Sequence, residues 1–141
     1  AVDKPIGRHP SQRQKMAVNF KHGKAAKTYY QITTSFGQAA CRLECKLETG
    51  RTHQIRVHMA HMGFPLIGDP QYGAQETYSR SLMKKAGFDD AVMQEVLDFP
   101  RQALHAHILS LVHPDTNELM TFEASLPNDL ESLISTLKSA G

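Results

Sequence analysis

Residues 41–62, CRLECKLETGRTHQIRVHMAHM, contain the change of pattern that decides the fold. Apolar and polar residues alternate over the first eight positions, and a period of two predicts a strand with one buried and one solvent-facing side. Gly50 interrupts the alternation. The next apolar residues follow helical spacing, i, i+4 and i+7: Ile55, Met59 and Met62. The stretch therefore predicts a strand-to-helix corner at residues 50–53, and the helix is expected to end at Gly63.

The rest of the chain carries weaker signals of both kinds. Further strands are predicted at residues 16–18, 28–34, 105–112 and 119–124. The last two form a hairpin around the turn residues 114–117. Residues 79–98 are predicted to be mainly helical with a break at Gly87, and spaced leucines predict a C-terminal amphipathic helix: Leu130, Leu133, Ile134 and Leu137. Together these signals predict an α+β fold, with a mixed, mainly antiparallel sheet and flanking helices, as a single domain over residues 1–141.

Composition bounds the class of protein. The 141 residues, 40% hydrophobic and 21% charged, suffice for one modest domain. No apolar run approaches the ~18 residues of a membrane span, and no signal peptide is evident. Cys41 and Cys45 lie roughly 13 Å apart along the predicted strand, too far for a disulfide, and on its buried side. Free core thiols favour a reducing compartment, and we expect the cytoplasm.

Charge is distributed unevenly. Residues 1–27 hold seven basic residues against one acid, Asp3, a net charge of +6, whereas the remainder carries −4. Residues 1–25 also contain two prolines and two glycines, which predicts an extended, linker-like segment. A basic segment of this kind indicates a polyanionic partner such as nucleic acid, and the alternative is a mobile, solvated arm.

Arg56 is the first candidate for chemistry. The predicted helix is apolar on several sides, so we expect it to be buried, and a buried arginine requires an anionic partner. A carboxylate suits the planar guanidinium, which can hold it with two hydrogen bonds. From the residues alone, a structural ion pair is the favoured interpretation and a site residue the alternative.

Arg51, Thr52 and His53 stand at the predicted helix start, where free backbone N–H groups favour an anion such as phosphate. The alternative is that Thr52 only caps the helix. Two pairs of histidines could suggest a metal: His58 with His61, and His105 with His107. No cysteine or carboxylate joins either pair at the usual ligand spacing, so no metal site is predicted.

Tyr29 and Tyr30 are neighbours in a predicted strand and should point to opposite sides of it. One is expected in the core, while the other could offer a ring on which a base stacks. The alternative is that both are ordinary strand tyrosines.

Four segments, in order, resemble the RluA/RluD type of pseudouridine synthase. Residues 5–18 resemble the basic linker in the form found in the large-subunit rRNA enzymes, and residues 24–30 resemble the tyrosine motif. Residues 47–72 resemble the arginine motif, which is long and specific. Residues 104–114, Leu104 to Pro114 including His113, resemble the last motif.

The resemblance implies isomerisation of specific uridines in 23S-type ribosomal RNA to pseudouridine, without a metal or cofactor. It implies that Arg56 pairs with a nucleophilic aspartate and that Tyr30 stacks on the target uracil. The residues expected to bind RNA are Arg8, Arg13, Lys15, Lys24, Arg51, Thr52, His53 and Gln54.

The nucleophilic aspartate of a His-Arg-Leu-Asp-type motif should lie upstream of the linker, and no such motif is present. Asp3 directly precedes the linker and does not fit, and Asp69 is expected to be a structural turn residue. The chain, which begins at Ala1, is therefore expected to be the C-terminal part of a catalytic domain. We expect it to be inactive alone and to associate with the missing N-terminal half or with itself. The rival hypotheses are a non-catalytic RNA-binding module and, least favoured, a metal-dependent hydrolase.

Overall fold

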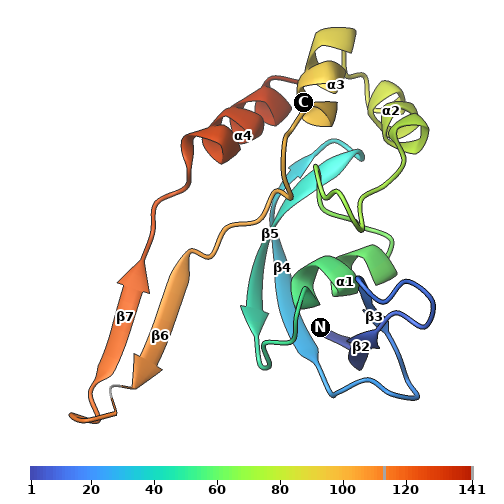
Figure 1. Cartoon of the computed structure of the whole chain (residues 1–141). Coiled ribbons are helices and arrows are strands. Elements are labelled where there is room, and N and C mark those ends of the chain that lie inside the picture. The colour runs from blue at the N-terminus through green and yellow to red at the C-terminus, as the bar shows by residue number, and fades with distance from the viewer. Residues whose placement is uncertain (113, 141) are drawn as a thin grey trace.

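The fold, obtained as a computed structural model that describes residues 1–112 and 114–140, combines four helices with three small antiparallel sheets (Figure 1). The predicted α+β class is confirmed, and every described strand pair is antiparallel. His113, part of the last predicted motif, lies outside the described residues. No helix in the described part of the chain is long and apolar enough to cross a membrane.

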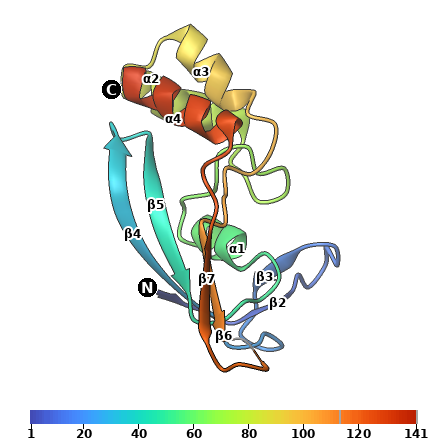
Figure 2. The same ribbon diagram turned by 90° about the vertical axis from the view of Figure 1, so that its left-hand side faces the viewer.

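A long twisted hairpin of β4 (Lys27–Phe36) and β5 (Ala40–Leu47) forms the spine of the molecule (Figures 1 and 2). Gly37 makes its turn with a φ of 60°, and the register shifts between Ile32 and Thr34. The short strand β1 (Val2–Asp3) pairs with the start of β4, so the strand order is β1-β4-β5.

A second hairpin, β2 (Ile6–Arg8) with β3 (Met16–Val18), lies beside helix α1 (Gln54–His61) (Figure 1). Ile6, Ala26 and Val57 form a small buried cluster between them. The predicted strand at residues 16–18 and the strand-to-helix corner are thus confirmed. The linker-like segment is ordered by β-pairing and by packing on α1.

The main apolar core lies at the other end of the spine, among α2 (Glu76–Lys85), α3 (Asp90–Leu97) and α4 (Asn128–Ala140). Phe36, at the tip of the β4–β5 hairpin, is buried in it. Gly87 separates α2 from α3 with a φ of 86°, as predicted, and Leu130, Leu133 and Leu137 confirm the amphipathic C-terminal helix.

Strands β6 (Ile108–Val112) and β7 (Leu119–Glu123) confirm the predicted hairpin, although β6 begins three residues later than expected. Figure 1 shows this hairpin extending as an arm beside the β4–β5 spine.

The predicted buried side of β5 is wrong. Cys41 is exposed and Cys45 only half-buried, and Leu47 is 44% exposed. Register places Tyr30 opposite Cys45, with Ile32 beside it on the same side. His58 of helix α1 contacts Thr28, which is fully buried, whereas Tyr30 and Ile32 on the same side are 36% and 56% exposed. Alternation identified the apolar side correctly, but burial requires a second layer. Both cysteines remain free thiols, as predicted.

Candidate active site around Arg56

Gln54 holds the corner between β5 and α1. Its Oε1 accepts hydrogen bonds from Thr49 Oγ1 and the Arg51 backbone N–H, both at 2.9 Å. Its Nε2 donates to the Lys27 carbonyl at 2.9 Å and to Thr28 Oγ1 at 3.1 Å. All four bonds of the amide are therefore used inside the chain, and the side chain is 3% exposed. The expectation that Gln54 contacts RNA is corrected: the residue joins three segments of the fold.

Helix α1 starts with His53 as its N-cap, in the left-handed region at a φ of 56° and without a side-chain cap. The alternative in which Thr52 caps the helix is therefore wrong. Because α1 begins at Gln54, Arg56 lies within its first turn. At the other end, Met62 lies beyond the last helical residue and is 40% exposed, and Gly63 ends the helix at a φ of 86°, as predicted.

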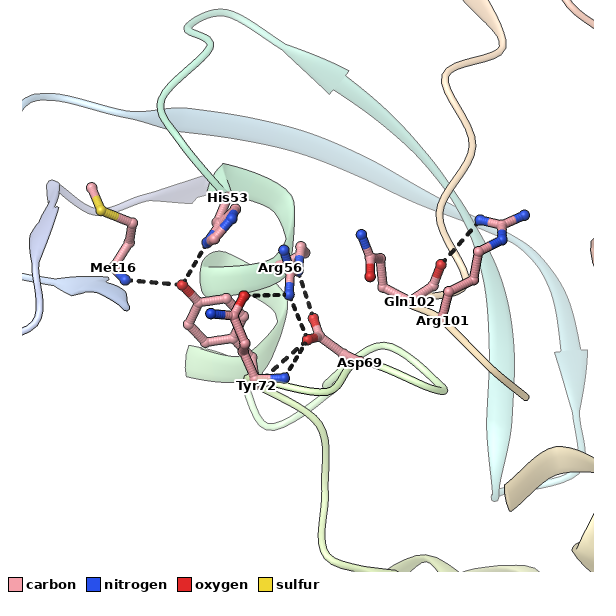
Figure 3. A network of polar contacts seen from close by, with 8 residues as sticks. Met16, His53, Arg56, Asp69, Tyr72, Arg101 and Gln102 are labelled. Atoms are coloured by element: carbon pink, nitrogen blue, oxygen red, sulfur yellow. Dashed lines mark hydrogen bonds and ion pairs between the residues drawn. The ribbon is translucent and has the colours of Figure 1, made fainter. Parts of the chain in front are cut away.

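Arg56 is paired with Asp69 (Figure 3). Arg56 Nε donates to Asp69 Oδ2 at 2.9 Å, and Nη2 donates to Oδ1 at 2.8 Å. The side chains are 9% and 0% exposed. Nη2 also donates to Gln71 Oε1 at 2.9 Å. The inward-facing arginine was predicted correctly, and the structural ion pair favoured from the residues alone is present.

Asp69 also organises the turn that follows it, as predicted. Its Oδ1 accepts the backbone N–H groups of Gln71 at 3.0 Å and Tyr72 at 3.1 Å. Burial by itself raises the pKa of this carboxyl, but the hydrogen bonds from Arg56 and from these two N–H groups outweigh it, so the net pKa lies below the ordinary 3.8. The carboxylate is thus held in its ionised form.

One edge of the Arg56 guanidinium remains open. Nη1 makes no hydrogen bond to any residue in the described ranges, although Nε and Nη2 are both engaged. In the same ranges, no fully buried side-chain nitrogen lacks a partner, so Nη1 must reach solvent. Asp69 therefore fixes the direction in which two N–H donors of Arg56 point outward, where they can receive a second anion.

Tyr72 closes the site on another side and was not singled out from the sequence. The Arg56 guanidinium lies 5.0 Å from the centre of its ring. Its hydroxyl accepts the Met16 backbone N–H at 2.9 Å and bonds His53 Nδ1 at 2.7 Å (Figure 3). Burial, followed by the positive charge of Arg56, lowers the pKa of His53, which favours its neutral form. Tyr72 thus links the basic hairpin to the arginine.

Comparisons with known proteins cover this site. Residues 1–61 match the family model described as RNA pseudouridylate synthase. Ribosomal large subunit pseudouridine synthase D of Pasteurella multocida is 47% identical over 138 residues, which is 98% of this chain and 40% of that protein. The chain is similar to pseudouridine synthases along almost its whole length. The predicted resemblance is thereby confirmed, and the match to the P. multocida protein takes in both Arg56 and Asp69.

Further family members agree. The Escherichia coli protein of the same name is 44% identical over 98% of the chain and 40% of its own length. The Bacillus subtilis protein named uncharacterized RNA pseudouridine synthase YlyB is 44% identical over 99% of the chain and 39% of its own length. The chain thus spans about 40% of the length of these relatives. Human RNA pseudouridylate synthase domain containing 1 shares the fold, with a TM-score of 0.60 and 23% identity over 97% of this chain and 58% of that one.

Both candidate tyrosines lie exposed on β4, so the expectation that one is in the core is wrong. The Tyr29 hydroxyl donates to Glu48 Oε2 at 3.0 Å, and Lys27 Nζ lies 5.0 Å from its ring centre. The Tyr30 side chain, 36% exposed, has no hydrogen bond or ring contact with the described residues, Arg56 included. Of the two, Tyr30 therefore has the ring that is free to receive a ligand.

The predicted RNA-binding residues fall into two groups. Arg8, Arg13 and Lys15 lie on the β2–β3 hairpin, and Lys24 pairs its backbone with Ile6. Arg51, Thr52 and His53 lie at the corner, where Arg51 Nε donates to the Ala25 carbonyl at 2.9 Å. Tyr72, through Met16 and His53, connects the groups.

Three of the four histidines considered as metal ligands make other contacts. His58 is fully buried, with Nδ1 at 2.8 Å from Thr28 Oγ1 and Nε2 at 2.8 Å from the Lys4 carbonyl. His105 and His107 both contact the Ala124 carbonyl. Residues 1–112 and 114–140 contain no group of three or more His, Cys, Asp or Glu side chains arranged to hold a metal.

Proposed function

We propose that this chain is the C-terminal part of the catalytic domain of a cytoplasmic enzyme that converts specific uridines of large-subunit ribosomal RNA to pseudouridine. The support is the similarity to RNA pseudouridylate synthases, which includes relatives named ribosomal large subunit pseudouridine synthase D that are 44–47% identical over almost the whole chain. The observation that carries the proposal is the Arg56 guanidinium, which Asp69 holds in place while Nη1 stays open. The β2–β3 hairpin, whose basic residues can contact RNA phosphates, is connected to this site through Tyr72.

In the proposed reaction, a nucleophilic aspartate supplied by the protein outside these residues approaches Nη1 of Arg56. Its carboxylate bonds to C1′ of the ribose as the N1–C1′ bond to uracil breaks. The base turns, the C5–C1′ bond forms as the bond between the aspartate and C1′ breaks, and the proton on C5 is lost while N1 gains one. Tyr30 stacks on the uracil once the nucleotide has left its helix, and it assists removal of the C5 proton.

Asp69 gives this arrangement a specific electrostatic property. Arg56 and Asp69 together are already neutral, so a second carboxylate at Nη1 adds one net negative charge. An N–H group of Nη1 would donate a hydrogen bond that orients this second carboxylate, but Asp69 already balances the positive charge of Arg56. We infer that the hydrogen bond from Nη1 keeps the nucleophilic carboxylate ionised and correctly oriented. Because Asp69 already balances the charge of Arg56, the carboxylate stays reactive.

The test uses the full-length protein that carries this chain and ribosomal RNA labelled with tritium at uridine C5. Release of tritium reports loss of the C5 proton. Wild-type protein should release tritium, Arg56→Ala should abolish release, and the 141-residue chain alone should release none. Near wild-type release by Arg56→Ala would overturn the role of Arg56. RNA binding without any release by the full-length protein would favour the non-catalytic RNA-binding module instead.

A further inference from the structure

A cationic hollow lies on the N-terminal hairpin, apart from the residues that surround Arg56. Its volume is about 620 Å³, and its lining consists of Arg8, Pro10, Arg13, Asn19, Lys21 and His22. Three of these side chains are cationic at neutral pH, and none is acidic. The volume falls in the range of ~300–1,000 Å³ common for ligand clefts, but such clefts are mostly lined by apolar side chains. Here Pro10 alone is apolar, which favours an anionic ligand.

Internal hydrogen bonds hold the cationic residues in place. Arg8 Nη1 donates to the Arg13 carbonyl at 2.9 Å, which ties the strand to its loop. Asn19 Nδ2 donates to the Arg8 carbonyl at 3.2 Å, and Asn19 Oδ1 accepts the N–H groups of Lys21 at 3.1 Å and His22 at 2.9 Å. The backbone around the hollow is therefore set before any ligand arrives, which lowers the cost of binding.

Gly23 shows how tightly the second loop closes. Its N–H donates to the Asn19 carbonyl at 2.8 Å, and a Cβ at this position would lie 2.3 Å from the same oxygen. Only glycine fits there, and the loop that carries Lys21 and His22 folds back on Asn19 as a result.

Two of the three cationic side chains, Arg13 and Lys21, have no competing partner among the described residues. The side chains of Arg13 and Lys21 make no hydrogen bond or ion pair with residues 1–112 or 114–140, and both are exposed. Asp3 is the only acid among residues 1–27. An arriving anion would thus meet positive charge that no nearby carboxylate cancels.

We propose that this hollow binds a backbone phosphate of the RNA strand, at a nucleotide other than the one that reacts. The inference rests on the proposed function for the identity of the polyanion. The β2–β3 hairpin is connected to the Arg56 site through the hydrogen bond from Met16 N–H to the Tyr72 hydroxyl. A phosphate held here would fix the position of the RNA strand relative to the corner at residues 50–53. It would do so without any contact that depends on the RNA sequence.

The experiment measures the Kd of the full-length protein for a fluorescein-labelled stem-loop transcript of large-subunit rRNA at several KCl concentrations. The test variant is Arg13→Gln/Lys21→Gln. The matched control, Lys84→Gln/Lys85→Gln, removes the same charge from exposed positions on α2. The test variant should bind more weakly, and the slope of log K against log[salt] should shrink by about 0.7–0.9 for one lost phosphate contact. The control should keep a steeper slope than the test variant.

Equal slopes and equal affinities for the two double variants would overturn the proposal, and this is also the result expected if the hollow served a protein partner. Tritium release from uridine C5, measured on the same samples, separates this proposal from the proposed function. If the wild-type protein releases tritium and the two double variants have equal salt slopes, the phosphate site in the hollow is refuted and the proposed reaction is not. A slope that depends on Arg13 and Lys21, without release by wild-type protein, refutes the proposed reaction and leaves the hollow as an RNA-phosphate site.

Discussion

Asp69 holds Arg56 by two nearly parallel hydrogen bonds, Nε to Oδ2 at 2.9 Å and Nη2 to Oδ1 at 2.8 Å. The carboxylate side chain is fully buried and the arginine side chain almost so. These two bonds use the edge of the guanidinium formed by Nε and Nη2. They also fix the orientation of the group, and therefore the direction in which Nη1 points. Asp69 is thus a positioning residue: it acts on the proposed reaction through Arg56 and does not itself touch the substrate.

The first prediction concerns the substitution Asp69→Asn. Loss of the charge leaves Arg56 buried without a counter-ion, which typically costs about 3–5 kcal/mol in the free energy of unfolding. Urea unfolding of wild-type and variant protein measures the difference. Asp129→Asn is the matched control, because Asp129 pairs with Arg101 by a similar pair of bonds but both side chains are more than one third exposed. Asp129→Asn should lower the free energy of unfolding by much less than Asp69→Asn does. Equal decreases for the two variants would show that burial does not decide the strength of the Arg56–Asp69 pair.

A second prediction is the pH dependence of that difference. The folded-state pKa of Asp69 is depressed below 3.8, so the unfolded chain takes up a proton first as the pH falls. The stabilisation from Asp69 is therefore complete above about pH 4 and is lost as the pH falls below 3.8 through the folded-state value. The gap in unfolding free energy between wild-type protein and Asp69→Asn should shrink only in that acid range. A gap that already closed between pH 7 and pH 5 would contradict the depressed pKa.

The third prediction is for Tyr72→Phe. The ring remains beside the Arg56 guanidinium, but the Met16 N–H and His53 Nδ1 lose the hydroxyl. An unsatisfied partly buried donor costs about 1–3 kcal/mol, so the variant should be less stable in urea and slower in tritium release. Tyr29→Phe is the control, since the Tyr29 hydroxyl lies on the exposed side of β4 and donates to Glu48, a side chain that is 57% exposed. If both variants lost the same stability, the hydroxyl of Tyr72 would not be what joins the hairpin to the site.

Local pattern was enough to predict the corner, the order of nearly every element and the inward direction of Arg56. The apolar residues around Arg56, at positions 55, 57 and 59, predict a helix that is buried on several sides. An arginine at position 56 is therefore expected to be buried as well. The partner could not be predicted, because residues 62–75 form an irregular connection and no periodicity specifies where Asp69 lies in space. Asp69 lies within the arginine motif, residues 47–72, but only the folded chain shows that it serves both the turn and the arginine.

Burial on β4 and β5 could not be predicted for a different reason. Alternation shows which side chains share one side of a strand, and the register confirms that Tyr30 and Cys45 do. Whether that side is covered depends on a layer contributed by other segments, and α1 contacts β4 near its start, at Lys27 and Thr28. Exposed Ile32 and Leu47, at 56% and 44%, are the consequence.

The last prediction tests the frame of the cationic hollow by steric means. In Gly23→Ala the new methyl group would lie 2.3 Å from the Asn19 carbonyl oxygen and 3.0 Å from Pro5, both backbone contacts that cannot rotate away. Overpacking of this kind costs about 1–3 kcal/mol. The shift should also separate Lys21 from Arg13, so RNA affinity should fall.

Gly50→Ala is the matched control for Gly23→Ala. Gly50 has no atom within 4 Å of an added Cβ and its φ is not positive, so stability and RNA affinity should stay near wild type. Urea unfolding and the salt-dependent RNA titration provide both measurements. If Gly23→Ala lost stability but kept the wild-type salt slope, the closed loop would support the fold without placing a phosphate-binding cation.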